Sequence, residues 1–377
     1  MKQVDSTKET QKMKAAVMEK AGAPLVIHDV AIAEPGPREV RVRTAAVGLC
    51  HSDLHMMQGT YPLPLPAVLG HEVSGVVEAV GTQVSGLKAG DHVVGCLSVY
   101  CGHCSVCASG HQVLCQNPEV KLPPGKANRL RLAGNPLSQV FNLSGFAEEI
   151  LVHENALVKI RDDMPLDRAA LLGCAVITGT GAVFHSAKVP PGSTVVVVGC
   201  GGVGLSVING AVIAGASRVI AVDMLPAKLE LARKFGATDV VNAGDGDPVA
   251  QVMQLTGGGA EFAFECIGLK QTAEQCYAML APGGTATVIG LFRPDARIEL
   301  PALDFLKEKR IQGSFMGSNR LSLDIPRLVE LYMQGKLLLD DLISQRISLE
   351  DINEGFIAMQ SGSVARSVIT FPGVGGL

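Results

Sequence analysis

The chain has 377 residues and a formal net charge of −4, with 47% hydrophobic and 18% charged residues. This composition is typical of a globular protein large enough for two domains, and it excludes a disordered chain and a general nucleic-acid binder. Charges or prolines interrupt the apolar runs before they reach about 18 residues, so we expect no membrane span.

The first residues, Met1 to Lys12, are polar and of mixed charge, and they lack the apolar core of a signal peptide. We therefore expect a short mobile tail and a cytoplasmic protein. In a reducing compartment the ten cysteines should be metal ligands and buried thiols rather than disulfides. Four of them lie in apolar or glycine-rich surroundings and are expected to be small core residues: Cys96, Cys200, Cys266 and Cys276.

From Lys14 to about Phe146, short β-branched runs alternate with glycine and proline turns, which predicts a mostly antiparallel β domain. The clearest expected strands are Glu39–Val47, Val73–Val80 and Asp91–Gly95. The stretch from Lys121 to Ser144 begins with polar residues and prolines, and we expect it to be an inserted loop.

Two sets of possible metal ligands occur in and around this region. Four cysteines with the spacing C-x2-C-x2-C-x7-C can close a tetrahedral zinc site with no open position, which is a structural site; they are Cys101, Cys104, Cys107 and Cys115. Cys50 and His71 precede that loop and Cys174 follows it. Three protein ligands that leave one position open are the usual arrangement of a catalytic zinc, so this second set favours an open site.

Polar neighbours of these ligands predict a route for a proton. Zinc lowers the pKa of an alcohol by stabilising its oxyanion, and the released proton must then reach solvent. Ser52 could take this proton, and His55 could pass it on as a general base near neutral pH. Asp53 could hydrogen-bond the outer nitrogen of His71 and orient it, and Glu72 is a nearby carboxylate that could tune or approach the metal.

From about Ala169 onward, strand and helix patterns alternate, which predicts βαβ units and a parallel sheet. The expected strands are Val195–Val198, Arg218–Val222, Asp239–Asn242, Phe262–Glu265 and Thr285–Ile289. The expected helices are Gly202–Ala214, Pro226–Phe235, Pro248–Thr256 and Gln271–Leu280. A later helix (Ile325–Gln334) and a last strand (Ser367–Phe371) should return to the first domain. Residues 179–317 would then be inserted between residues 1–178 and 318–377.

A glycine run after the strand Val195–Val198 has the spacing of a dinucleotide fingerprint. Gly199 permits a tight turn, Gly201 and Gly202 let the backbone approach a pyrophosphate at the helix N-terminus, and Gly204 allows the helix to pack closely on the strand. Asp223 lies 19 residues beyond Gly204, at the end of the next strand. Its carboxylate would accept hydrogen bonds from the ribose hydroxyls and repel a 2′-phosphate, so NAD is favoured over NADP.

Together these residues resemble the zinc-dependent medium-chain alcohol dehydrogenases, specifically the long form similar to the animal liver enzymes. The resemblance extends from Lys14 to Phe371. The motifs that carry it are Gly48-Leu-Cys-His-Ser-Asp53, Gly70-His-Glu72, the four-cysteine loop, Leu172-Gly-Cys174, Val198-Gly-Cys-Gly-Gly-Val-Gly-Leu-Ser206, Phe264-Glu-Cys-Ile-Gly268 and Ile352-Asn-Glu-Gly-Phe356. The resemblance implies an α/β fold in which a GroES-like, mostly antiparallel β domain holds both zinc sites and a Rossmann domain with a doubly wound parallel sheet binds NAD.

The resemblance also implies the partners of the chain and further residues at the coenzyme. The expected partners are two zinc ions per chain, NAD, an alcohol or aldehyde, and further copies of the chain in a homodimer or homotetramer that forms near Arg297–Pro301. The residues expected at the coenzyme are His51 and Arg366 on the pyrophosphate, Lys228 near the adenosine ribose, and Thr178 and Val203 against the nicotinamide ring.

Departures from related enzymes define the alternatives. Glutathione-dependent formaldehyde dehydrogenases share the long architecture. They place an arginine after the last structural cysteine, where this chain has Gln116-Asn-Pro-Glu-Val120. They also usually lack a histidine at the position of His55. That activity is one alternative, and a non-catalytic zinc- and NAD-binding structural protein is another. Leu97 and Val140 stand where liver enzymes often have aromatic residues, which predicts a wide pocket for bulky aliphatic or aryl primary alcohols.

Overall fold

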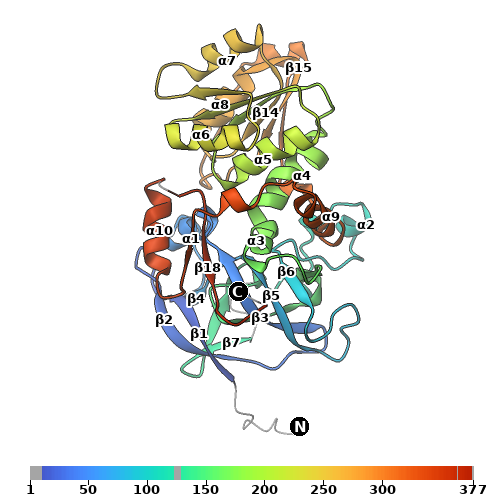
Figure 1. Cartoon of the computed structure of the whole chain (residues 1–377), viewed down its shortest axis with the longest axis vertical. Coiled ribbons are helices and arrows are strands. Elements are labelled where there is room, and N and C mark those ends of the chain that lie inside the picture. Colours follow the sequence, from blue (N-terminus) through green and yellow to red (C-terminus); the bar gives the residue numbers. More distant parts are fainter. Residues whose placement is uncertain (1–10, 123–128, 363, 376–377) are drawn as a thin grey trace.

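The computed structural model describes residues 11–122, 129–362 and 364–375. Two parts are stacked along the long axis of the molecule, with a helical segment running between them (Figure 1). The predicted tail lies mostly outside the described residues, but Gln11 and Lys12 belong to the first strand, so the prediction is wrong for these two residues.

The part that contains the N-terminal and C-terminal segments is built from a β-barrel and a seven-stranded sheet. The barrel is closed along the path β1-β2-β7-β8-β4. The sheet has the order β10-β6-β5-β3-β18-β17, and β9 also pairs with β3. The strands are β1 (Gln11–Met18), β2 (Val26–Ile32), β3 (Glu39–Gly48), β4 (Ala67–Val68), β5 (Glu72–Val80), β6 (His92–Gly95), β7 (Leu130–Leu132), β8 (Asn135–Gln139), β9 (Glu149–His153), β10 (Leu157–Lys159), β17 (Gln345–Ile347) and β18 (Ser367–Thr370).

Strand β3 shows why these residues form a sheet with one buried face. Its first half alternates valine and arginine, and successive side chains of a strand point to opposite faces. Val40 and Val42 are accordingly buried, while Arg41 and Arg43 lie on the other face. Most strand pairs of this part are antiparallel, as predicted; β4 with β8 and β17 with β18 are parallel.

The stretch from Lys121 to Ser144 is not the simple loop that we expected. Residues 123–128 lie outside the described residues, but β7 and β8 follow as a hairpin that completes the barrel. These strands are short and contain a proline and several polar residues, which hid them in the sequence. The buried Arg129 at the start of the hairpin is neutralised by Glu39, 2.6 Å away.

The second part is a six-stranded parallel sheet with the order β13-β12-β11-β14-β15-β16, which is the doubly wound order of a Rossmann fold. Helices α5 and α6 pack on one face of this sheet, and α7 and α8 pack on the other. The strands are β11 (Thr194–Val198), β12 (Arg218–Asp223), β13 (Asp239–Asn242), β14 (Ala260–Glu265), β15 (Leu280–Val288) and β16 (Arg310–Gly313), and the helices are α5 (Gly202–Ile213), α6 (Pro226–Lys234), α7 (Pro248–Thr256) and α8 (Lys270–Ala278). The predicted fold class is therefore confirmed.

A long apolar helical segment, residues 166–187, joins the two parts. It consists of α3 (Leu166–Leu171), a π-helical stretch (Leu172–Val176), α4 (Ile177–Gly181) and a second π-helical stretch (Ala182–Ala187). By length and composition alone it could span a membrane, so the expectation that no such apolar run exists is wrong. Its most apolar window is 83% buried inside the protein, as in a core helix of a globular fold.

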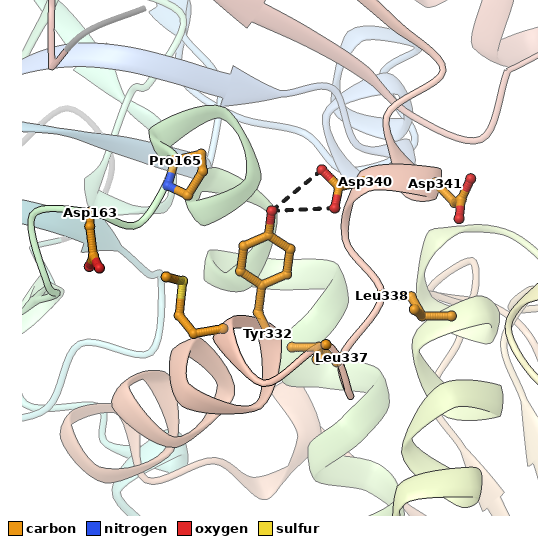
Figure 2. Close-up of a pocket in the computed structure, with 9 residues that line it drawn as sticks. Asp163, Pro165, Tyr332, Leu337, Leu338, Asp340 and Asp341 are labelled. Atoms are coloured by element: carbon orange, nitrogen blue, oxygen red, sulfur yellow. Dashed lines mark hydrogen bonds between the residues drawn. The ribbon is translucent and has the colours of Figure 1, made fainter.

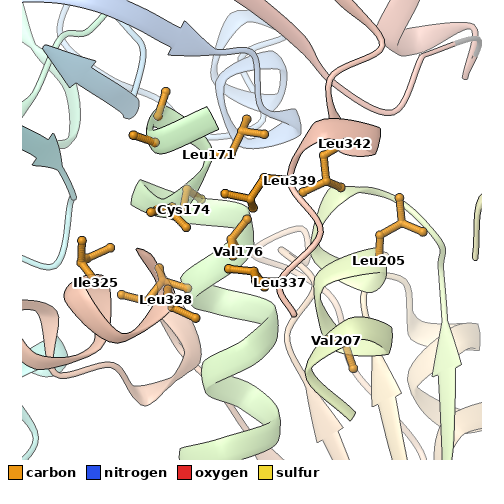
Figure 3. Packing of buried hydrophobic residues seen from close by; sticks show 14 of the residues in the cluster. Leu171, Cys174, Val176, Leu205, Val207, Ile325, Leu328, Leu337, Leu339 and Leu342 are labelled. Atoms are coloured by element: carbon orange, nitrogen blue, oxygen red, sulfur yellow. The ribbon is translucent and has the colours of Figure 1, made fainter. Parts of the chain in front are cut away.

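Figure 3 shows how this helix forms the core between the two parts. Leu171 and Val176 pack against Leu337 and Leu339 of the returning chain, and Leu205 of α5 belongs to the same buried cluster. The remaining helices are α1 (His51–Met57), α2 (Ser105–Ala108), α9 (Leu321–Met333) and α10 (Ile352–Gln360). The predicted boundary between residues 178 and 179 falls inside the continuous helix, and the exact division into domains remains a prediction.

Candidate active site

Four possible ligands converge where the two parts meet. One ligand atom from each of Cys50, His71, Glu72 and Cys174 lies within 4.8 Å of the other three. Cys50 is the N-cap residue of α1, and His71 and Glu72 stand at the start of β5. Cys174 lies in the first π-helical stretch of the core helix, and such irregular turns often occur at functional sites.

The imidazole of His71 is oriented as a metal ligand would be. His71 is fully buried, and its Nδ1 lies 3.1 Å from Oδ1 of Asp53, which is the orienting contact that we expected. The opposite ring nitrogen, Nε2, is buried without a hydrogen-bond partner. A buried polar atom is costly unless it is paired, so an unpaired nitrogen beside two thiols fits a bound zinc ion. Cys50 and Cys174 are 5% and 6% exposed, so they mark the more accessible side of the cluster.

The contacts within the cluster shift the pKa values of its members. The neighbouring thiol of Cys174 lowers the pKa of Cys50 well below its ordinary value, assisted by the charges of Arg366 and His71. Burial alone would lower the pKa of His71, but Asp53 and Cys50 raise it well above its usual value. Burial raises the pKa of Glu72 to about 7, because a carboxylate without solvent favours its neutral form.

Arg366 connects this cluster to the glycine run. Its guanidinium lies 3.3 Å from Oε1 of Glu72 and donates a hydrogen bond of 2.8 Å to the carbonyl oxygen of Leu49. A Cβ atom on Gly202 would collide with the same guanidinium, so Arg366 also lies against the N-terminus of α5. Its Nε is buried without a partner, which fits an anionic group at that helix terminus.

The glycines of the run have the geometry that a dinucleotide needs. Gly199 has φ +96°, which a residue with a side chain rarely adopts. A Cβ on Gly204 would collide with the carbonyl oxygen of Gly199, whereas a Cβ on Gly201 would meet nothing, so that backbone is open to a ligand. Asp223 ends β12 and accepts hydrogen bonds from the backbone N–H groups of Cys200 (2.8 Å) and Leu225 (3.1 Å).

The other residues expected at the coenzyme lie around this loop. The positive charges of Arg366 and Lys228 both act on His51. Partial desolvation and the charge of Arg366 lower the pKa of His51 to about 4, so this histidine is neutral near pH 7. Val203 is partly buried in the first turn of α5, and the buried Thr178 donates a hydrogen bond of 3.5 Å to the sulfur of Met316.

The proton route is placed only in part. Oγ of Ser52 lies 3.8 Å from the sulfur of Cys50, and the partly buried His55 follows one turn later on the same helix. Among the described residues no hydrogen bond joins Ser52 to His55. The relay through both side chains therefore remains a prediction.

The four-cysteine loop forms a second cluster. Its four sulfur atoms lie within 4.8 Å of one another, and two pairs, Cys101 with Cys107 and Cys104 with Cys115, are 3.9 Å apart. The loop contains the short helix α2; three of the four cysteines are buried and Cys104 is partly exposed. Four sulfur ligands fit a closed, structural zinc site.

Phe141 is the residue of the site that the sequence analysis missed. Its ring lies 4.8 Å from the ring of His71, centre to centre, in an edge-to-face arrangement. The backbone of Phe141 has φ +55°, and no spacing rule predicts a left-handed aromatic residue at that place. Val140, which we had expected to border the pocket, is almost fully buried, and Leu97 is partly buried between the two largest core clusters.

A hollow of about 400 Å³ lies away from this cluster, between α9 and the turn after it. Figure 2 shows Tyr332 directing its hydroxyl to Asp340, with Asp163 and Asp341 at the rim. Arg161 and Arg168 already pair with Asp163 and Asp340, so the acidic residues of this hollow serve to join surface elements.

Comparison with known proteins agrees with this geometry. Residues 36–162 match the family model "Alcohol dehydrogenase GroES-like domain", and residues 202–334 match the model "Zinc-binding dehydrogenase". The chain is 37% identical to alcohol dehydrogenase 1 of Trifolium repens and 39% identical to alcohol dehydrogenase class-3 of Drosophila melanogaster, each match covering 95% of this chain and 97% of the relative. Benzyl alcohol dehydrogenase from Acinetobacter calcoaceticus has a similar crystal structure, with a TM-score of 0.90, 36% identity and coverage of 96% of this chain and 99% of that one.

Proposed function

The chain belongs to the zinc-dependent medium-chain alcohol dehydrogenases, and from that membership we propose that it oxidises bulky primary alcohols, aliphatic or aryl, reversibly to aldehydes with NAD as the hydride acceptor. The observation that carries the proposal is the convergence of Cys50, His71 and Cys174 beside Arg366 and the glycine run. A metal-ligand cluster next to a dinucleotide loop suits metal-assisted hydride transfer from an alcohol.

Each residue of the site then has a defined task. Cys50, His71 and Cys174 would hold the zinc ion, which when bound acts as a Lewis acid that favours the alkoxide form of the alcohol. Asp53 fixes the orientation of His71. Ser52 would accept the hydroxyl proton of the alcohol, and His55 would release it to solvent.

The coenzyme would bind across the carboxyl ends of the parallel strands. The N-terminus of α5 and Arg366 would bind the pyrophosphate, Asp223 would bind the adenosine ribose with Lys228 nearby, and His51 would donate one N–H. Thr178 and Val203 would bring the nicotinamide ring close to the alcohol.

Two observations support bulky substrates. Leu97 leaves more room than the aromatic residue that liver enzymes often have at its position, and it lies where the two largest core clusters meet. In addition, the similar Acinetobacter enzyme is a benzyl alcohol dehydrogenase. An equal or higher efficiency with ethanol than with benzyl alcohol or hexanol would contradict this part of the proposal.

The test is NADH formation by the purified protein with ethanol, hexanol, octanol and benzyl alcohol, before and after removal of zinc by a chelator. We expect chelator-sensitive turnover with NAD and two zinc ions per chain in metal analysis. Two bound zinc ions without turnover of any alcohol would contradict the proposal and favour a non-catalytic zinc- and NAD-binding protein.

Glutathione-dependent formaldehyde oxidation is the second candidate, since one relative is a class-3 alcohol dehydrogenase. The stretch after Cys115 contains no arginine, and its Glu119 lies 3.3 Å from His103. An acidic residue there would repel the carboxylates of glutathione. Formaldehyde with glutathione should therefore be a poorer substrate than benzyl alcohol, and the opposite order would favour the second candidate.

We also infer that the protein works in the cytoplasm as a dimer or tetramer. All ten cysteines are free thiols in the structure, which suits a reducing compartment. An apolar surface beside the edge strand β16, close to Arg297–Pro301, supports association of the Rossmann sheets.

A further inference from the structure

The turn between β16 and α9 has a strained backbone. The chain leaves the parallel sheet at this turn, after the edge strand of that sheet. Two residues other than glycine, Met316 and Ser318, have φ of +49° and +50°, and Gly317 between them has φ +69°. Left-handed residues with a side chain persist only where the surrounding structure imposes the strain, and such strain is concentrated at functional sites.

The turn packs directly on the core helix. A Cβ atom on Gly317 would lie 2.4 Å from the carbonyl oxygen of Ile177 and 2.8 Å from that of Thr178, so glycine alone allows this approach. The hydroxyl of Thr178 donates a hydrogen bond of 3.5 Å to the sulfur of the buried Met316. A displacement of the turn would therefore remove the support of Thr178, the residue that we place against the nicotinamide ring.

One buried amide ties this turn to the other part of the molecule. Asn319 is 2% exposed, and its Nδ2 donates hydrogen bonds of 2.8 Å to the carbonyl oxygen of Met316 and to Oγ of Ser98. Ser98 is also buried, and it lies three residues after β6 of the seven-stranded sheet. Since one amide group makes both bonds, the turn is held against a point outside the parallel sheet.

The remaining atom of this amide indicates why an asparagine stands here. Within the part of the chain that the structure describes, Oδ1 of Asn319 is buried without a hydrogen-bond partner. A buried acceptor without a partner destabilises the folded state, and a leucine of similar shape would avoid that penalty. Departures of this kind from the rules of packing are expected at functional positions. What the amide provides in return is the pair of bonds from its nitrogen.

We propose that Asn319 is a positioning residue of the reaction: by tying the strained turn to Ser98, it keeps Met316 against Thr178 and thereby holds the nicotinamide ring close to the alcohol. The inference rests on the proposed function and deepens it, because it adds a residue that acts through two others. A displacement of about 1 Å at the reacting atoms can slow an enzyme about 100-fold, so the contacts behind the ring matter for the rate.

The test replaces Asn319 by leucine, which has a similar shape and makes neither bond. In Asn319→Leu the single-turnover rate of NADH formation from benzyl alcohol should fall about 10- to 100-fold, with an undiminished deuterium isotope effect, because hydride transfer itself is slowed. The inhibition constant of ADP-ribose, which lacks the nicotinamide, should stay unchanged. A general disruption of the coenzyme site would raise that constant instead.

Asn353→Leu is the matched control. The amide of Asn353 also joins two distant segments, with hydrogen bonds of 2.9 and 3.0 Å to the backbone of Leu25, but it lies on α10 and not at the turn. This variant should leave the single-turnover rate unchanged. Zinc is counted in each variant. If Asn319→Leu does not fold or loses zinc, Ser98→Ala replaces it, since it removes one of the two bonds and should lower the same rate by a smaller factor.

A double variant tests the path through Met316. Met316→Leu removes the sulfur that accepts the bond of Thr178, and together with Asn319→Leu it should lower the rate no further than Asn319→Leu alone, because both changes act on one contact. Losses that simply multiply would overturn this path.

Three other results would overturn the inference: an unchanged single-turnover rate in a zinc-loaded Asn319→Leu or Ser98→Ala protein, a rise in the ADP-ribose constant as large as the fall in rate, or an equal fall in Asn353→Leu. Failure of the proposed function is distinguishable from these results, because the unmodified protein would then form no NADH with any alcohol.

Discussion

Asp223 accepts hydrogen bonds from two backbone segments, one in the glycine run and one directly after β12. Its two carboxylate oxygens accept the N–H groups of Cys200 and Leu225, so the side chain is held at the end of β12, where a ribose would lie. A charged acceptor contributes more to a hydrogen bond than a neutral one, and its charge also excludes a phosphate.

We expect Asp223→Gly to raise the KM for NAD about 10- to 100-fold, the effect of losing one charge-assisted hydrogen bond, and to raise the relative efficiency with NADP. Initial rates with both coenzymes at saturating alcohol measure this. Asp223→Asn is the control, because an amide oxygen can still accept the bond from Cys200 while the charge is gone. If the unmodified protein already prefers NADP, the role given to Asp223 is wrong.

The residues of the site differ in how far their roles can be predicted. The spacing of Cys50, His71 and the four-cysteine loop indicates metal binding, since those residue types have few other reasons to occur together. The placement of Arg366 and Phe141 in the site depends on the path of the backbone. Arg366 stands nearly at the end of the chain and still reaches Glu72 and α5. The rules of local sequence patterns predict neither the approach of residues so far apart in the chain nor a left-handed φ.

At the scale of elements, the loop from Cys101 to Cys115 depends on its sulfur cluster. It contains one short helix and one 3₁₀ turn, too little regular structure to fold alone, so the metal would supply its stability.

We therefore expect Cys104→Ser to lower the zinc content from two ions per chain to one and to lower the midpoint of thermal unfolding. Metal analysis and a melting curve measure both. Ser105→Ala, one residue away on α2, is the control and should change neither. A fully stable Cys104→Ser protein with one zinc ion would contradict the structural role of this loop.

A buried carboxylate, that of Asp167, joins the core helix (residues 166–187) to strand β17 of the returning chain. Asp167 in α3 accepts hydrogen bonds from Arg168 (2.8 Å) and from Arg346 of β17 (2.6 and 2.8 Å). Burial alone would raise the pKa of Asp167, but the two guanidinium groups lower it. A carboxyl group whose pKa is lowered by folding stabilises the folded state above its unfolded pKa of about 3.9, and this contribution is lost as the pH falls through the folded pKa.

Asp167→Asn should lower the free energy of unfolding by about 1–3 kcal/mol at pH 7, toward the lower end because both guanidinium groups are partly exposed. The difference from the unmodified protein should shrink below about pH 4. Urea unfolding at several pH values measures this. Asp163→Asn, which removes an exposed partner of Arg161, should have little effect. A difference that does not change with pH would show that the charge of Asp167 is not its source.

Elements with a clear period were predicted within a few residues of their observed ends, whereas irregular ones were not. The valine run of β11 and the helices α6 and α7, which begin at a proline, have a strong local signal. Strands β7 and β8 are short and owe their existence to the barrel that they close. The π-helical turn around Cys174 arises from packing between the two parts and has no signal in sequence.

At the scale of the whole molecule, the two parts touch at more than the core helix. The hydroxyl of Tyr61 donates a hydrogen bond to the carbonyl oxygen of Phe292, which joins the loop after α1 to the loop after β15. The alternation of elements predicts the parallel sheet, whereas the order of its strands is seen in the structure. The contact between Tyr61 and Phe292 joins segments that are far apart in the sequence, so only the folded structure reveals it. The same is true of the apolar surface that the fold leaves exposed.

One exposed surface has the character of an interface between copies of the chain. Leu303, Phe305 and Leu306, on the 3₁₀ turn Ala302–Lys307, are 70%, 49% and 81% exposed. They lie just before β16, the edge strand of the parallel sheet, whose outer side offers unpaired backbone groups. Scattered apolar residues are normal on a surface, but a group of them beside an open sheet edge favours association.

We expect Leu306→Arg, alone or with Leu303→Arg, to shift the protein to monomers, because burying an unpaired guanidinium in an apolar interface is costly. Size-exclusion chromatography with light scattering, at micromolar concentration, measures the mass. Ile357→Arg is the control: Ile357 is 65% exposed on α10, far along the chain from this surface, and should leave the mass unchanged. An unmodified protein that is already monomeric would contradict the expected association, and an oligomer that survives both substitutions would place its interface elsewhere. Since Leu306 lies outside the ligand cluster, a monomer that keeps its zinc and its turnover would show that each chain holds a complete site.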